Sequence, residues 1–186
     1  MIAIVDYGAG NLHSVCNALD VIGRPYKIAQ MPLDLADADA ILLPGVGHFG
    51  QMMRSLESTG MADRLRDEAA NKTPLLGICL GMQALFASSE EAPDVPGLGL
   101  LPGEIKRFAD VPRIPHMGWN DVEGIGIFYF ANSFYAPVSE CTTGVSEYSI
   151  EFSAIVQKGN VAGFQFHPEK SGDAGLDLLR KWCESC

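Results

Sequence analysis

The chain has few basic residues and no long apolar run, and these two absences exclude several classes of protein. Lys and Arg number 13 against 23 Asp and Glu, which gives the 186 residues a net charge of −10. A phosphate backbone requires a basic surface, so we expect no nucleic-acid partner. No apolar stretch approaches the roughly 20 residues that a membrane-spanning helix needs, so we expect no membrane partner. The opening residues MIAIVDYG have neither the basic nor the long apolar segment of a signal peptide, which favours a cytoplasmic protein.

Cysteines are few, odd in number and irregularly spaced. The five are Cys16, Cys79, Cys141, Cys183 and Cys186. None belongs to a paired C-x-x-C arrangement typical of zinc, because Cys183 and Cys186 lack a second pair, so we expect no metal site. In a reducing cytosol these thiols are expected to be free. Cys16 and Cys183 continue apolar helical stripes and are predicted to be core residues.

Apolar residues, by contrast, make up 47% of the chain, and their pattern indicates an α/β fold. Strand-like runs occupy residues 1–7, 25–28, 38–45 and 74–79, and helical patterns occupy 11–23, 49–71 with a break near Gly60, and 80–88. Short connections between such elements favour a mostly parallel, doubly wound sheet with helices on both faces. Further strands are predicted over 127–130, 151–157 and 160–169, before a helix over 172–183, and we expect this half to add antiparallel strands. The length suits a single domain, residues 1–186.

The segment GICLGMQ, residues 77–83, places a cysteine between two glycines where a predicted strand meets a predicted helix. This is the pattern of a nucleophile elbow, G-x-S-x-G, with Cys79 in place of serine. Flanking glycines relieve Cβ clashes in a sharp turn, and the helix N-terminus favours a thiolate. The same pattern also fits a cysteine that is merely buried in a tight strand–helix junction.

A thiolate nucleophile needs a base and a group that orients the base. Of four histidines, only His167 lies beside a carboxylate in a suitable pattern, in FQFHPEKSG. In an extended segment residues two apart share a face, so His167 and Glu169 are expected to project the same way, and Pro168 between them disfavours helix. The alternative is an exposed histidine at a strand end. H-x-E with the cysteine elbow predicts a Cys-His-Glu triad.

Two more glycine-rich turns follow predicted strands. In PGVG, residues 44–47, two glycines allow the backbone to approach a ligand, and an amide there could complete an oxyanion hole with the Leu80 amide. Taken alone, an ordinary strand–helix turn explains PGVG better. YGAGN, residues 7–11, does not continue as a dinucleotide fingerprint, because position 13 is His rather than Gly, and nucleotide binding there is rejected.

These residues, in this order, resemble the class I, or triad, glutamine amidotransferases. IVDYGAGNLHSV, LPGVGHFG, GICLGMQALF, IPHMGWN and GFQFHPEKSG are similar in particular to the glutaminase subunits of imidazole glycerol phosphate synthase, an enzyme of histidine biosynthesis. The segments run from the first strand to Ser171, which is nearly the whole chain. The resemblance implies the fold of that family.

The resemblance also implies a reaction without a cofactor. Cys79 would attack the carboxamide of glutamine, His167 would pass the thiol proton to the leaving ammonia, and Glu169 would orient His167. Water would then hydrolyse the thioester to glutamate, while the amides of Val46 and Leu80 stabilise the oxyanion. Residues implied to bind glutamine are Gly45, Gly47, Gln83, Glu91, Ser133 and Phe134.

A partner is implied as well. In this family the ammonia passes to a (β/α)8-barrel cyclase subunit, and the heterodimer makes imidazole glycerol phosphate and aminoimidazole carboxamide ribotide. Residues implied to face that partner are Gly8, Asn11, Met117, Trp119, Asn120, Tyr129 and Lys170.

Two positions depart from the family pattern. Asn132 stands where relatives usually have histidine, which affects local hydrogen bonding rather than the triad. DVEGIGIF, residues 121–128, is shorter than the usual connection, and we expect a shortened loop beside the partner face.

Three alternatives stay open. The chain could serve another amidotransferase, such as those for anthranilate, aminodeoxychorismate or pyridoxal phosphate, although YGAGN, WN and HPEKS argue against that. It could be a non-catalytic regulatory subunit, although the intact Cys79, His167 and Glu169 argue against a scaffold. It could be a stand-alone cysteine hydrolase, which should act without a partner.

Overall fold

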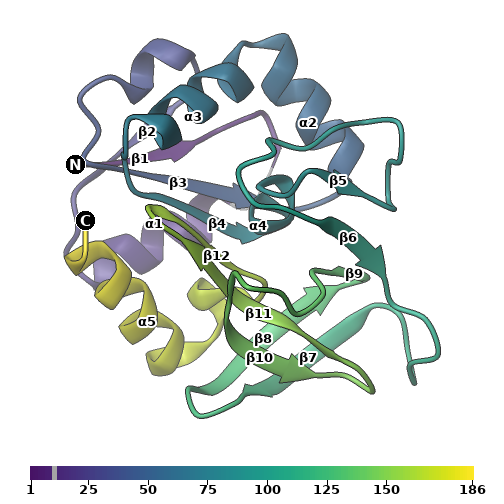
Figure 1. The fold of residues 1–186 in the computed structure, drawn as a ribbon. Coiled ribbons are helices and arrows are strands. Elements are labelled where there is room, and N and C mark those ends of the chain that lie inside the picture. Colours follow the sequence, from purple (N-terminus) through teal and green to yellow (C-terminus); the bar gives the residue numbers. More distant parts are fainter. Residues whose placement is uncertain (10–11) are drawn as a thin grey trace.

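A seven-stranded sheet forms the centre of the computed structural model, which describes residues 1–9 and 12–186 (Figure 1). The strand order is β10-β11-β12-β4-β3-β1-β2. The parallel part comprises β1 (Ile2–Val5), β2 (Tyr26–Ala29), β3 (Ala40–Gly45), β4 (Leu75–Cys79) and β12 (Val161–Phe164). Two antiparallel strands, β10 (Thr142–Glu147) and β11 (Glu151–Lys158), extend it beyond β12. The predicted α/β class and mostly parallel sheet are confirmed.

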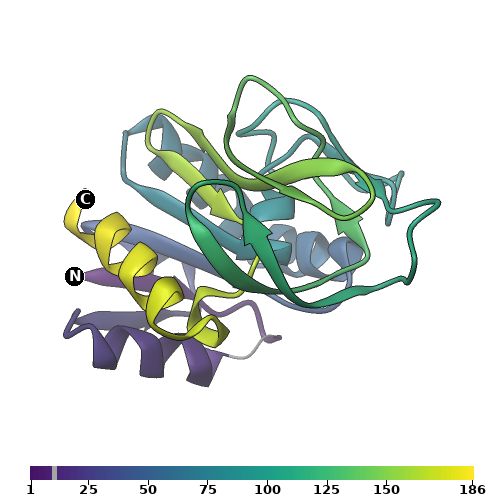
Figure 2. The ribbon, with the colours of Figure 1, turned by 90° about the horizontal axis from the view of Figure 1, so that it is seen from below.

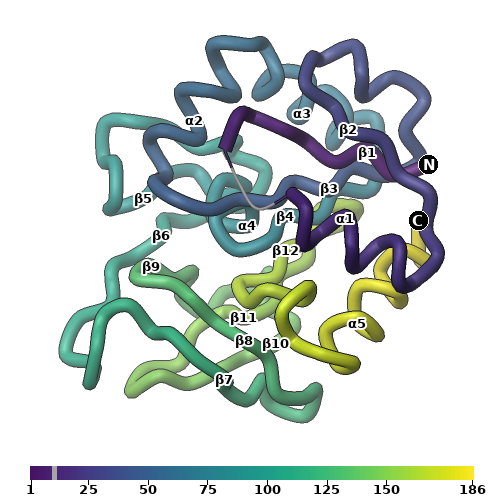
Figure 3. Tube along the Cα trace, turned by 180° about the vertical axis from the view of Figure 1, so that it is seen from behind, coloured from purple at the N-terminus to yellow at the C-terminus, as the bar shows by residue number. Residues whose placement is uncertain are grey.

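Helices cover both faces of this sheet, as predicted for a doubly wound fold. α2 (Phe49–Ser58) and α3 (Met61–Ala70) lie on one face, and the predicted break near Gly60 separates them. α1 (Leu12–Val21) and α5 (Gly172–Glu184) lie together on the other face (Figures 2 and 3). Alternate residues of β1 and β3 point to opposite faces, so each face supplies its own hydrophobic core.

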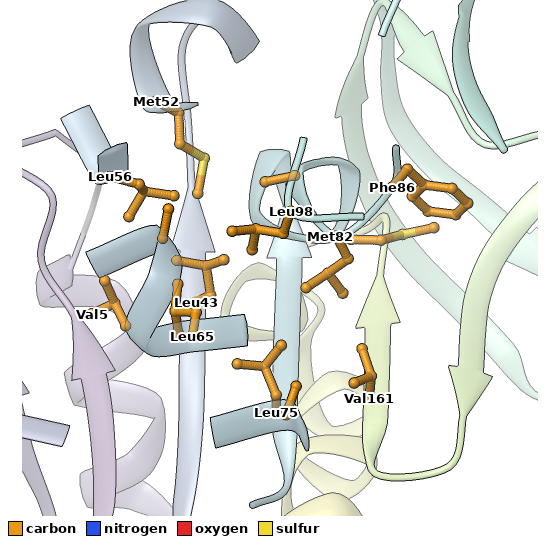
Figure 4. Close-up of a cluster of buried hydrophobic side chains, with 14 of the residues drawn as sticks. Val5, Leu43, Met52, Leu56, Leu65, Leu75, Met82, Phe86, Leu98 and Val161 are labelled. Atoms are coloured by element: carbon orange, nitrogen blue, oxygen red, sulfur yellow. The ribbon is translucent and has the colours of Figure 1, made fainter. Parts of the chain in front are cut away.

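The core beneath α2 and α3 is made mostly of aliphatic and methionine side chains, with Phe49 and Phe86 among them (Figure 4). Met52 and Leu56 of α2 and Leu65 of α3 pack over Leu43 of β3 and Leu75 of β4, and all five are essentially buried. Burying such a side chain stabilises the fold by about 1.5–3 kcal/mol each. This packing fixes the ends of β3 and β4, where the glycine-rich turns lie.

The two predicted helical core cysteines differ in their burial in the core beneath α1 and α5. Cys183 is buried, as predicted, whereas Cys16 is only half-buried and packs against the edge of the cluster. All five cysteines are free, which agrees with the expectation from the sequence. Within the described residues no helix has the length and apolar character needed to cross a membrane.

A smaller outer layer of strands completes the structure. β7 (His116–Val122) and β8 (Gly126–Asn132) form an antiparallel ribbon, and β5 (Ser88–Ser89), β6 (Glu104–Arg107) and β9 (Phe134–Tyr135) form a three-stranded sheet (Figure 1). The β7–β8 connection is a turn of only residues 123–125. Stacked and edge-on aromatic rings, including Phe128 on Phe166 with centroids 4.1 Å apart, join the ribbon to the main sheet.

Several predicted boundaries were wrong. α4 spans only Leu80–Ala84 rather than 80–88, and residues 88–89 form β5 instead. The predicted strand over 160–169 ends at Phe164, and a 3-10 turn, η2 (Pro168–Lys170), follows. A second 3-10 turn, η1 (Pro32–Leu35), was not predicted, nor were β6, β7, β9 and β10.

Candidate active site

Cys79 lies at the sharp turn between β4 and α4. It is the N-cap residue of α4, with φ +54° and ψ −112°, a conformation that L residues rarely adopt. Gly77 and Gly81, on either side of Cys79, lie too close to neighbouring backbone atoms to carry a side chain. A Cβ on Gly77 would lie 2.6 Å from backbone atoms of Gly81, and a Cβ on Gly81 would lie 1.8 Å from the Leu43 carbonyl oxygen. The predicted elbow is therefore present, and its strain is held by tight packing between strands and helix.

His167 and Glu169 lie together close to this elbow. The Nδ1 atom of His167 is 2.8 Å from Oε1 of Glu169, and the two side chains are only 5% and 3% exposed. The expectation that both residues lie in one extended strand was wrong, because Glu169 belongs to the 3-10 turn η2. Pro168 is the first residue of that turn, where its fixed φ and missing N–H are tolerated. The turn brings the carboxylate back to the imidazole.

The ribbon strand β8 holds His167 in place. The His167 backbone N–H donates to the Tyr129 carbonyl at 2.9 Å. The Ser171 hydroxyl donates to the His167 carbonyl at 2.6 Å and accepts from the Tyr129 N–H at 2.9 Å. These bonds connect the histidine to the strand that also carries the predicted partner-facing Tyr129.

The electrostatics of the three side chains favour a charged histidine. Burial lowers the pKa of His167, but hydrogen bonds with Cys79 and Glu169 and their negative charges outweigh burial and raise that pKa to about 10. At neutral pH the imidazole therefore carries a proton between two acidic partners. Oε2 of Glu169 is buried and has no hydrogen-bond partner among the described residues, so the carboxylate acts on His167 through Oε1.

A pocket of about 340 Å³ opens beside Cys79. It brings together most of the residues that the sequence indicated, namely Val46, Gly47, Cys79, Leu80, Gln83, Glu91, Ser133, Phe134, His167 and Lys170. Gly45 pairs with Cys79 in the sheet register and lies behind the lining. Pro115, Ala131 and Asn132 also line the pocket and were not predicted as site residues.

The two candidate oxyanion donors are in different states. Leu80 is the first residue of α4, where backbone N–H groups have no intrahelical acceptor. The Val46 N–H donates to the Tyr7 hydroxyl oxygen at 3.1 Å, and the same hydroxyl donates to the Val46 carbonyl at 3.2 Å. The Val46 amide is thus hydrogen-bonded to Tyr7, a residue that the family resemblance placed only on the partner side, as part of residues 7–11.

Two of the predicted glutamine contacts are fixed by hydrogen bonds. Glu91 accepts the Phe49 N–H at the start of α2 through Oε2 at 2.7 Å. Gln83 donates through Nε2 to the Phe134 carbonyl at 3.0 Å, and Asn132 Nδ2 donates to the same carbonyl at 2.9 Å. The backbone of residues 133–134, expected to contact the substrate, is therefore held from two sides.

The predicted partner-facing residues lie around the pocket mouth and on the ribbon. Met117 and Trp119 are 60% and 59% exposed, and Trp119 pairs with Tyr129 across the ribbon. Asn120 lies on the opposite side of the ribbon, where its Nδ2 donates to the Glu147 carbonyl at 2.8 Å. Gly8 is exposed, and Asn11 lies outside the described residues.

One further buried polar residue beside the cysteine, Gln165, was missed by the sequence interpretation. The pattern F-Q-F-H contains a signal for it, since a polar residue alternates with phenylalanines directly before His167. In the part of the chain that the structure describes, no cluster of three or more His, Cys, Asp or Glu side chains could hold a metal ion.

Comparison with known proteins places this chain in a family. The family model for class-I glutamine amidotransferases matches residues 3–123. The chain is 47% identical over 185 residues to the imidazole glycerol phosphate synthase subunit HisH of a strain of Thermus thermophilus, covering 95% of this chain and 93% of that protein. HisH of Moorella thermoacetica is 45% identical, with 98% and 94% covered. HisH of Methanothermobacter thermautotrophicus is 43% identical, with 99% and 98% covered.

Solved structures agree on the fold. A crystal structure of a glutamine amidotransferase superposes with a TM-score of 0.80 at 23% identity, covering 99% of this chain and 98% of that one. The structure of PurLQS from Thermotoga maritima gives a TM-score of 0.73 at 20% identity, with 99% and 97% covered. The chain belongs to the class-I glutamine amidotransferases and, within them, to the family of HisH subunits of imidazole glycerol phosphate synthase.

Proposed function

We propose that the chain hydrolyses glutamine at Cys79 and delivers the ammonia to a cyclase subunit of imidazole glycerol phosphate synthase. The observation that carries this proposal is the constellation of Cys79, His167 and Glu169, with the cysteine on a strained elbow at the floor of a pocket. The protonated state of His167 supports a thiolate–imidazolium pair at rest.

The thiolate of Cys79 attacks the carboxamide carbon of glutamine and forms a tetrahedral oxyanion. The N–H of Leu80 stabilises this oxyanion, joined by that of Val46 once Tyr7 releases it. The C–N bond breaks as His167 gives its proton to the leaving nitrogen, so ammonia and a thioester form. A water molecule then attacks the thioester, His167 accepts a proton from that water, and glutamate leaves as the thiolate is restored.

The partner is proposed from the relatives and from the surface around the pocket. The relatives are named as subunits of imidazole glycerol phosphate synthase, so we expect a heterodimer with a (β/α)8-barrel cyclase. Met117 and Trp119 expose apolar area beside the pocket that also holds Lys170, which suits a docking face. Ammonia released there would enter the partner without crossing bulk water.

The test is glutamate release by the purified chain alone and with a cyclase partner loaded with its nucleotide. We expect a low rate alone and a large rise in the complex. The variant Cys79→Ala should lose glutamate release and keep synthesis driven by added ammonium, while Cys186→Ala, an exposed thiol remote from the pocket, should behave as wild type. Equal rates with and without the partner would favour a stand-alone hydrolase. Glutamine hydrolysis that never yields imidazole glycerol phosphate would point to a different amidotransferase.

A further inference from the structure

Gln165 is a fully buried polar side chain that no step of the proposed reaction uses. It is 0% exposed and lies two residues before His167, just beyond the end of β12. Phe164 and Phe166 stack on each other with centroids 5.3 Å apart and pack into the aromatic core under the ribbon. Because neighbouring residues of an extended segment point to opposite sides, Gln165 and His167 share the side that faces Cys79.

The amide of Gln165 bonds at both ends. Its Nε2 donates to the Sγ atom of Cys79 at 3.9 Å, and its Oε1 accepts from Nε2 of Gln83 at 3.0 Å. A buried amide without partners would destabilise the fold, so these bonds explain how the residue is tolerated there. They also place an N–H donor directly against the sulfur of the nucleophile.

The orientation of the Gln165 amide follows from a backbone group. The Phe134 carbonyl can only accept, so Gln83 must direct Nε2 toward it, at 3.0 Å. The same Nε2 also contacts Gln165, which must therefore present its oxygen to Gln83 and its nitrogen to Cys79. Both hydrogens of the Gln83 amide are used. The Gln165 amide therefore cannot be flipped, and its nitrogen is the atom that faces Cys79.

A donor in this place distinguishes the two forms of the cysteine. The Nε2 atom of Gln165 lies 3.9 Å from the sulfur. A thiol there would be only a weak acceptor, whereas a thiolate accepts a charge-assisted bond of roughly twice the strength. From these contacts we infer that Gln165 is a positioning residue, which stabilises and aims the Cys79 thiolate through its side-chain N–H. The inference rests on the proposed role of Cys79 as nucleophile.

The network also joins the nucleophile to the segment expected to hold the substrate. Phe134 is linked to Cys79 through Gln83 and Gln165, so the network joins three separate parts of the chain. Glutamine that settles on the backbone of residues 133–134 would therefore meet a thiolate whose direction is set by the same hydrogen bonds. Loss of Gln165 should accordingly affect kcat more than KM.

Two variants test the inference. Gln165→Met keeps an unbranched side chain of similar length but removes the donor, and Gln165→Glu keeps an acceptor for Gln83 but places negative charge beside the sulfur. In the complex we expect kcat for glutamine hydrolysis to fall by about 10- to 100-fold in Gln165→Met, which is the effect of losing one hydrogen bond to a charged group. We expect a larger fall in Gln165→Glu. Gln157→Leu, an exposed glutamine on β11, is the matched control and should match wild type.

The decisive readout is alkylation of Cys79 by iodoacetamide across pH, followed by peptide mass spectrometry so that the other thiols do not interfere. We expect the midpoint of the alkylation profile to move to higher pH in both variants, with ammonium-driven synthesis in the complex unchanged. An unshifted profile in both variants would overturn the inference. A lower melting temperature accompanied by a loss of ammonium-driven synthesis would overturn it too, because it would show general damage to the fold. Absence of glutamine hydrolysis by the wild-type complex would refute the proposed function, yet the alkylation profiles would still decide the role of Gln165.

Discussion

At the scale of single residues, the site is organised by contacts between side chains and backbone groups that lie far apart in the chain. The Tyr7 hydroxyl holds both backbone polar groups of Val46, 39 positions away. Burial raises the pKa of this hydroxyl, and the negative charge of Cys79 contributes in the same direction, so the phenol stays neutral and close to the nucleophile. An oxyanion would have to compete with Tyr7 for the Val46 N–H.

Replacing Tyr7 tests this competition. In Tyr7→Phe the ring remains but the acceptor is gone, so the Val46 N–H becomes available to the oxyanion. We expect glutamate release by the chain without its partner to rise by about 2- to 10-fold, the rate change that corresponds to the net free energy of one ordinary hydrogen bond. An unchanged or lower rate, at an unchanged melting temperature, would show that Tyr7 does not restrain the amide.

The same distance in sequence explains which site residues could be predicted. Cys79, His167 and Glu169 stand in short local patterns, a glycine-flanked cysteine and H-x-E, and each pattern reflects a local turn. Tyr7 and Gln165 act across 39 and 86 positions, respectively. The pattern F-Q-F-H marks Gln165 as a polar residue among phenylalanines, but it does not indicate the partner of that residue, and nothing beside Tyr7 indicates its contact with Val46. Glu169 was predicted to lie in an extended strand because Pro168 disfavours helix. Proline also suits the first residue of a turn, which is its position here.

At the scale of elements, the elbow depends on how closely α4 approaches β3 and β4. Gly45, Gly77 and Gly81 lie where a side chain would enter the backbone of a neighbouring element. This close approach lets the strand turn directly into a helix and keeps Cys79 in its strained conformation.

Alanine at Gly81 should break this arrangement. Its Cβ would lie 1.8 Å from the Leu43 carbonyl oxygen, so β3 and α4 must separate. We expect Gly81→Ala to lower the free energy of unfolding by about 3 kcal/mol or more and to abolish glutaminase activity. Gly159→Ala is the matched control, since Gly159 has φ +60° but no neighbour within 4 Å, and only about 1–2 kcal/mol of backbone strain is expected. Equal unfolding midpoints for the two variants in urea would contradict the steric explanation.

The elements of the parallel half were predictable because burial and periodicity agree there. The outer strands were not. β7 carries its large apolar residues Met117 and Trp119 outward and buries His116, so its pattern does not resemble that of a half-buried strand. α4 was predicted too long because tertiary contacts end it, with the Leu98 N–H bonded to the Ala84 carbonyl in place of a helical donor.

At the scale of the whole molecule, two buried histidines give stability opposite dependences on pH. The pKa of His167 is raised to about 10, so its stabilising contribution is complete below its unfolded value near 6.5 and is lost as pH rises toward 10. Burial lowers the pKa of His116 below 6.5, so the folded state resists its protonation and loses stability as pH falls. For these two histidines together, stability is therefore expected to be greatest near pH 6.5 and to decline on either side.

His116 connects parts of the fold that the main sheet does not join. Its ring stacks between Tyr148, at 4.1 Å, and Phe130, at 5.1 Å, and thereby links the β7–β8 ribbon to the turn between β10 and β11. Its Nδ1 is buried and finds no hydrogen-bond partner within residues 1–9 and 12–186. A proton on this ring would place an unpaired charge inside an aromatic cluster, which should loosen the ribbon that carries the predicted partner face.

The variant His116→Phe keeps the stack and removes the titrating group. At pH 7 we expect its melting temperature to stay near that of wild type, because an unpaired buried nitrogen is removed along with the weak contact to Asn120 at 3.4 Å. Below pH 6.5 the wild-type melting temperature should fall more steeply than that of the variant, while both should fall together toward pH 10, where His167 loses its proton. Parallel curves on the acid side would show that carboxylates, and not His116, set the acid limit of stability. Scanning calorimetry across this range, with glutaminase activity measured in the complex at each pH, would also show whether loosening of the ribbon separates the partner before the sheet unfolds.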